Sequence, residues 1–132
     1  MNTPNHLALL LAAPQPGETA MLADQAAMTA AVLDRGLPAD RILALQGQLD
    51  SPRVTAFLQV ASRRVAGWND GSVFVHVSGH GFFTGETAEE ARPGLLFSES
   101  DDVTDDEHLF WDDLFATLAL PPGVRLTLLP DL

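Results

Sequence analysis

Residues 71–85 read Gly-Ser-Val-Phe-Val-His-Val-Ser-Gly-His-Gly-Phe-Phe-Thr-Gly, and the rest of the chain is best interpreted as a scaffold around this stretch. Val73 to Val77 is a continuous apolar run between turn residues, which is typical of a strand buried in a parallel sheet. Ser78-Gly79-His80-Gly81 follows at the carboxyl end of that strand, where open α/β sheets hold ligands and catalytic groups. The sequence predicts that His80 lies on a tight glycine turn, either as a site residue or as a solvated histidine of a structural turn.

Outward from this stretch, strand patterns alternate with helix patterns. Short apolar runs predict three further strands, at Leu7–Ala13, Ile42–Leu45 and Val124–Leu129. Apolar residues at helical spacing predict helices over Thr19–Arg35, from Ser51 to Gly67, and from Trp111 to Pro121. This order predicts one α/β domain over residues 1–132, a three-layer sandwich with a mostly parallel sheet.

Local signals add three details to this outline. Ser51 followed by Pro52 predicts that Ser51 is the N-cap of the second helix. Met21 and Met28 are interpreted as core filler on the first helix. Gly94–Ser98 predicts a short strand or one arm of a hairpin.

Composition limits the possible functions. Among the 132 residues, 18 acids against 7 basic residues give a net charge of −11, which disfavours nucleic acid and anionic membranes as partners and favours basic peptides or cations. The apolar run at Leu7–Ala13 is too short to span a membrane, so a cytoplasmic protein is the default expectation. The chain has no cysteine and therefore no thiol nucleophile of its own.

The order of elements, together with Val-His-Val-Ser-Gly-His-Gly ending at Gly81, resembles the caspase-like cysteine peptidases, especially the prokaryotic caspase and metacaspase branch. The resemblance covers nearly the whole chain. It implies that His80 is the catalytic acid or base and that Gly81 offers its amide to the oxyanion hole. In that family the following strand ends in Asp, one variable residue and the nucleophilic Cys; Pro130-Asp131-Leu132 matches up to the variable residue, where the sequence ends.

The same resemblance suggests two groups of acidic site residues. Asp24 and Asp131 would form an acidic S1 pocket for Arg or Lys at P1, although Asp24 could equally be a surface acid and Asp131 a frayed end residue. The acidic run could bind Ca²⁺, as in some metacaspases, or form a solvated loop without an EF-hand ligand order. The candidate Ca²⁺ ligands are Asp101, Asp102, Asp105 and Asp106. No other cofactor is expected.

Two functional hypotheses follow. In the first, the chain is the large-subunit-like part of a caspase-like cysteine endopeptidase that cleaves after basic residues when complete and is inactive alone. In the second, it is a non-catalytic pseudo-peptidase that binds a protein partner. In either case the apolar strand at Val124–Leu129 is expected to leave an open sheet edge, which invites pairing with a missing segment or a partner chain.

Overall fold

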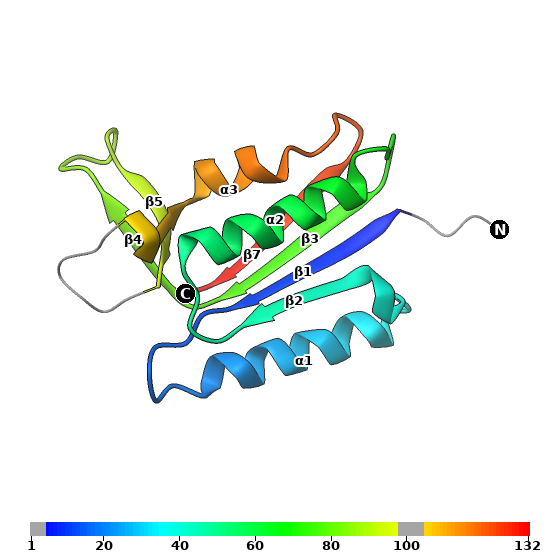
Figure 1. The fold of residues 1–132 in the computed structure, drawn as a ribbon, viewed down its shortest axis with the longest axis horizontal. Coiled ribbons are helices and arrows are strands. Elements are labelled where there is room, and N and C mark those ends of the chain that lie inside the picture. Colours follow the sequence, from blue (N-terminus) through cyan, green and yellow to red (C-terminus); the bar gives the residue numbers. More distant parts are fainter. Residues whose placement is uncertain (1–4, 98–104) are drawn as a thin grey trace.

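The main sheet contains four strands that run parallel to one another (Figure 1). The computed structural model describes residues 5–97 and 105–132. The strand order is β2–β1–β3–β7, so β3 lies between β1 and β7. The strands are β1 (His6–Ala12), β2 (Ile42–Gln46), β3 (Ser72–Ser78) and β7 (Arg125–Asp131). The four strands predicted for this sheet are all present, and the predicted α/β class with a mostly parallel sheet is confirmed.

Helices lie on both faces of the main sheet and give the molecule three layers (Figure 1). The helix α1 (Ala20–Asp34) packs on one face, against β1 and β3. The other face carries α2 (Ser51–Val65) and α3 (Trp111–Leu118), which pack against each other. A short 3-10 helix, η1 (Ala39–Arg41), leads into β2. None of the helices in the described ranges is both long and apolar enough to cross a membrane.

The hydrophobic core lies between the sheet and the layer formed by α2 and α3. Val73, Val75 and Val77 of β3 point to this side and are completely buried, as are Leu58 of α2 and Leu114 of α3. Each such side chain contributes about 1.5–3 kcal/mol through burial. Trp68 and Trp111 pack at the margin of this cluster, in agreement with their predicted packing role. The α2–α3 layer is therefore the main source of apolar stabilisation.

The first helix, α1, buries fewer side chains against the sheet than predicted. Gln25 is the buried residue of α1, whereas Met21 and Met28 are partly exposed and lie outside the core cluster. The interpretation of these methionines as core filler is therefore wrong. In the described residues α1 is the one helix on this face, so β3 and β7 have no second helix above them (Figure 1).

The second helix begins one residue earlier than predicted. Asp50, rather than Ser51, is the N-cap, and its Oδ1 atom accepts a hydrogen bond of 2.9 Å from the amide of Arg53. Pro52 lies in the first turn, where its missing N–H leaves no helical bond unmade. Asp50 and Ser51 are both residue types that commonly cap helices. Here the carboxylate of Asp50 is the group that reaches the Arg53 amide, which has no partner within the helix.

A small antiparallel sheet extends from the carboxyl end of β3. It contains β4 (His80–Thr84), β5 (Arg92–Leu96) and β6 (His108–Phe110), with a 3-10 helix, η2 (Asp105–Glu107), before β6. The predicted Gly94–Ser98 strand corresponds to β5, shifted toward the N-terminus, and β4 and β6 were not predicted. His80 is consequently the first residue of a strand that follows the turn, and not a residue on the turn itself.

Candidate functional site

The carboxyl ends of β3 and β7 meet beside His80. The amide of Gly79 donates a 3.1 Å hydrogen bond to the carbonyl oxygen of Asp131, which joins the end of β7 to the start of the turn. The side chain of Leu132 packs over Gly81, with its Cδ1 atom 2.9 Å from the place where a Cβ atom of Gly81 would stand. The end of the chain therefore lies beside the His80–Gly81 step.

Asp24 and Asp131 line one shallow cavity of about 350 Å³ on the α1 side of the sheet. Asp24 comes from α1 and Asp131 from the last position of β7. The hydroxyl of Ser78, which precedes the turn at Gly79, donates a 3.2 Å hydrogen bond to Oδ2 of Asp24. The remaining lining residues are Ala27, Met28, Ala31 and His76. Two carboxylates that are 107 positions apart in the sequence thus share one opening, where their negative charges favour a cationic ligand.

His76 adds a polar group that the sequence did not single out as functional. Its side chain lines the same cavity and is 3% exposed, and its Nδ1 atom has no hydrogen-bond partner among the described residues. An unpaired buried polar atom costs folding free energy, about 1–3 kcal/mol. The alternation of Phe74, His76 and Ser78 along β3 already placed His76 on the same face as the Ser78 hydroxyl. This alternation is the one signal in the sequence that links His76 to the cavity.

His80 is bound by Glu18, a residue that no pattern in the sequence marks as functional. The Nε2 atom of His80 lies 2.8 Å from Oε1 of Glu18, and the same oxygen accepts a 2.7 Å hydrogen bond from the amide of Gln15. The hydrogen bond from His80 and, to a smaller extent, the hydrogen bond from the Gln15 amide lower the pKa of the Glu18 carboxyl below its usual value. Because an ionised carboxylate can only accept a hydrogen bond, Nε2 of His80 carries a proton and donates the hydrogen bond to Glu18.

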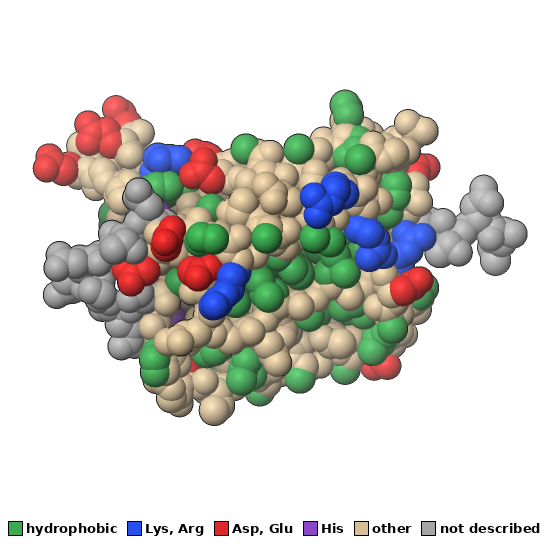
Figure 2. Space-filling view, viewed as in Figure 1, with side chains coloured by type: hydrophobic (Ala, Val, Ile, Leu, Met, Phe, Trp, Pro, Cys, Tyr) green, Lys and Arg blue, Asp and Glu red, His purple; other side chains and the backbone are tan. Residues whose placement is uncertain are grey.

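Of the other predicted site residues, Gly81 and Asp106 lie in or next to the small antiparallel sheet. Gly81 is in β4, opposite Leu95 of β5. Asp101 and Asp102 lie outside the described residues, and so does the side chain of Asp105. Asp106 is exposed in η2, and no group of three metal-ligating side chains is found within the ranges 5–97 and 105–132. Figure 2 shows several acidic side chains gathered at the end of the molecule that carries the β4–β5 hairpin.

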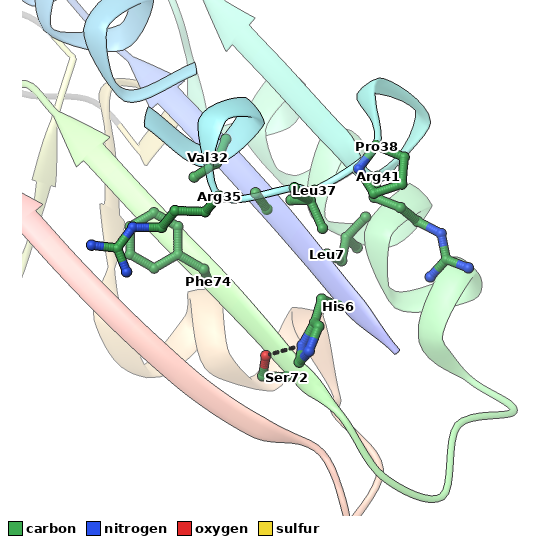
Figure 3. A pocket seen from close by; sticks show the side chains of 11 residues that line it. His6, Leu7, Val32, Arg35, Leu37, Pro38, Arg41, Ser72 and Phe74 are labelled. Carbon is green, nitrogen blue, oxygen red and sulfur yellow. Dashed lines mark hydrogen bonds between the residues drawn. The ribbon is translucent and has the colours of Figure 1, made fainter. Parts of the chain in front are cut away.

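A separate cavity of about 420 Å³ lies at the opposite, amino-terminal end of the strands (Figure 3). Phe74, Val32 in the last turn of α1 and Arg35, the residue that follows this helix, line the cavity. His6 binds the Ser72 hydroxyl at 2.7 Å on its other side. A neighbouring cavity of about 680 Å³ shares Phe74 and continues over Leu129. These cavities follow the uncovered part of the sheet and do not include His80.

Comparison with known proteins does not identify a family for this chain. No protein-family model matches it, and no curated protein matches it. The residues at the carboxyl ends of β3 and β7 are therefore the features of this chain that bear on its function.

Proposed function

We propose that this chain is the part of a caspase-like cysteine endopeptidase that supplies the histidine and the pocket for a basic P1 residue. The observation that supports the proposal is the cavity shared by Asp24 and Asp131, next to the turn at Gly79 that leads from Ser78 to His80. In the proposed enzyme the thiol comes from outside these 132 residues, because the chain contains no cysteine. Alone, the chain is expected to bind substrate side chains and not to cleave peptides.

In the proposed reaction His80 first takes the proton of the thiol, and the resulting thiolate attacks the carbonyl carbon of the scissile peptide. The Gly81 amide donates to the oxyanion that develops on the carbonyl oxygen. The C–N bond then breaks, the leaving amine takes the proton from His80, and an acyl thioester remains. Water hydrolyses this thioester with His80 as the base, which regenerates the thiol and releases the acid.

The preference for a basic P1 residue follows from the two carboxylates. A guanidinium group can form paired hydrogen bonds with a carboxylate, whereas an ammonium group acts as a point charge between both. The Ser78 hydroxyl holds Asp24 from the sheet side, so the carboxylate of Asp24 is already oriented before the ligand enters. The net charge of −11 also favours the approach of a cationic peptide.

The alternative is a non-catalytic module that uses the same cavity to bind a basic side chain of a protein partner. The absence of cysteine from the sequence favours this alternative, because binding requires no nucleophile. The two functions share the pocket and differ in whether His80 can activate a thiol, so each needs its own experiment.

The pocket is tested by calorimetric titration of the 132-residue chain with N-acetyl-arginine amide and with its neutral isostere, N-acetyl-citrulline amide. A charged hydrogen bond contributes about 1.5–3 kcal/mol, so arginine should bind about 10- to 150-fold more tightly than citrulline. Asp24→Asn and Asp131→Asn should each remove most of this difference. Asp34→Asn is the matched control, because Asp34 is an exposed carboxylate at the far end of α1. Equal affinity for both ligands, or tighter binding of N-acetyl-aspartate amide, would refute the pocket.

The catalytic hypothesis is tested by appending one cysteine after Leu132, at the position that follows the family's Asp and variable residue. The rate at which iodoacetamide alkylates this thiol should fall at least tenfold in the His80→Ala version, because the imidazole can no longer take the thiol proton. The same rate in both versions would contradict the endopeptidase hypothesis and favour the binding module.

A further inference from the structure

The loop between β1 and α1 holds the Glu18 carboxylate in a fixed position. Pro16 and Gly17 occupy the two central positions of a turn that the amide of Glu18 closes with a 3.0 Å hydrogen bond to the carbonyl of Gln15. Gly17 has φ of +88°, as the third position of a type II turn requires, and proline suits the second position. The Glu18 side chain then folds back, and its Oε1 atom accepts a 2.7 Å hydrogen bond from the Gln15 amide. Gln15 is itself buried, so the turn is attached to the body of the protein.

This fixed carboxylate determines which nitrogen of His80 is left for chemistry. We propose that Glu18 is the positioning residue of His80: by accepting the Nε2 proton at 2.8 Å, it orients the ring and leaves Nδ1 as the nitrogen that takes and returns a proton. The inference rests on the proposed function, because a positioned imidazole matters only where a proton is to be moved.

The solvent exposure of the His80–Glu18 pair indicates that the main effect of the contact is to orient the His80 ring. The side chains of His80 and Glu18 are 41% and 35% exposed, so water screens their charges and the pair adds little to folding stability. Orientation does not depend on that net energy. A carboxylate already held by the Gln15 amide gives the ring one preferred direction, and the turn that carries it is preset by Pro16 and Gly17.

The proton balance of the proposed step is simple. A thiol S–H bond breaks, and its proton forms a new bond to Nδ1 of His80 while the electron pair stays on sulfur. The ring becomes an imidazolium whose Nε2–H still donates to the ionised Glu18, now as a charge-assisted hydrogen bond. When the peptide C–N bond breaks, the Nδ1 proton moves to the leaving amine. Glu18 keeps its charge throughout and exchanges no proton.

The test is nuclear magnetic resonance of the unmodified 132-residue chain, with ¹⁵N labelling of the histidines. The Nε2 proton of His80 should be visible in slow exchange with water, should persist in Glu18→Gln, whose amide oxygen can still accept it, and should disappear in Glu18→Ala. Glu86→Ala is the matched control, since Glu86 is an exposed acid in the β4–β5 hairpin loop. A signal that is absent from the parent chain, or that survives in Glu18→Ala, would overturn the inference.

A second measurement separates positioning from a structural role. In the version with the appended cysteine, Glu18→Ala should lower the alkylation rate at neutral pH by about tenfold and flatten its pH profile, whereas Glu18→Gln should retain most of the rate and Glu86→Ala all of it. Unchanged rates and profiles in Glu18→Ala would contradict the positioning role. If the His80 signal depends on Glu18 but N-acetyl-arginine amide does not bind, the proposed pocket fails and the Glu18–His80 pair remains.

Discussion

Replacing Gln25 with methionine should destabilise the fold by about 1–3 kcal/mol, although the helix that carries Gln25 is mostly exposed. Gln25 is the buried residue of α1, at 4% exposure. Its Nε2 atom donates to the carbonyl oxygens of Leu10 in β1, at 3.0 Å, and of Leu45 in β2, at 3.1 Å. A neutral hydrogen bond contributes about 0.5–1.5 kcal/mol net, and Gln25→Met removes two of them while keeping a side chain of similar length.

Gln25→Met should also disturb the candidate site, because Asp24 is the neighbour of Gln25 on the same helix. With Met21 and Met28 only partly buried, α1 has little apolar burial to replace the lost hydrogen bonds. Urea unfolding followed by far-ultraviolet circular dichroism measures the effect. The midpoint should fall without a change in slope, and the melting temperature should drop by about 4 °C per kcal/mol.

The matched control is Gln59→Met, the same chemical change at an exposed position of α2. We expect it to change the free energy of unfolding by less than about 0.5 kcal/mol, as is usual for surface substitutions. If Gln25→Met were as mild as Gln59→Met, the two hydrogen bonds would not anchor α1. In that case α1 would not depend on Gln25 for its place over the sheet.

Two further predictions concern acidic groups. The pKa of Glu18 is lowered in the folded chain, so its contribution to stability is fully present above the pKa of an unfolded glutamate, about 4.3, and is lost as the pH falls through the lowered folded value. The difference in urea midpoint between the parent chain and Glu18→Gln should therefore shrink on acidification, and a difference independent of pH would contradict this. Ca²⁺ binding at the acidic segment should give heat in calorimetric titration at millimolar concentration and less heat in Asp106→Asn; the absence of heat in the parent chain would rule out the calcium site.

The main sheet could be predicted because each of its strands has a recognisable local sequence pattern. Leu7 to Ala13 is a continuous apolar run, and Val73 to Val77 is apolar except for His76; a strand covered on both faces in a parallel sheet requires such a pattern. The faces of β3 were predictable for the same reason, since side chains alternate along a strand. Asp24 and Asp131 were picked out through the resemblance to a family, and the structure brings them to one cavity.

The small antiparallel sheet and Glu18 could not be predicted because they depend on contacts between distant residues. The strand β6 is only three residues long, and its Phe110 packs against Phe82 of β4 with ring centroids 5.3 Å apart. Arg92 lies 3.8 Å from the centroid of the Phe110 ring and completes this contact. Glu18 reaches a histidine 62 positions away, and the sequence signals only the turn that carries it. Pairing of this kind is decided by the folded geometry, not by local pattern.

The outer edge of β7 limits how another strand could complete the main sheet. In the described residues β7 has one strand neighbour, β3, and the amide of Arg125 donates to Gly71 on that side at 3.0 Å. Backbone groups alternate in direction along a strand, so Leu126, Leu128 and Pro130 present theirs to the open edge. Pro130 has no N–H, which leaves Leu126 and Leu128 as the donors and blocks regular pairing next to Asp131. We therefore expect an added strand to bind the first half of β7 and to leave the carboxylate of Asp131 free for the cavity that it shares with Asp24.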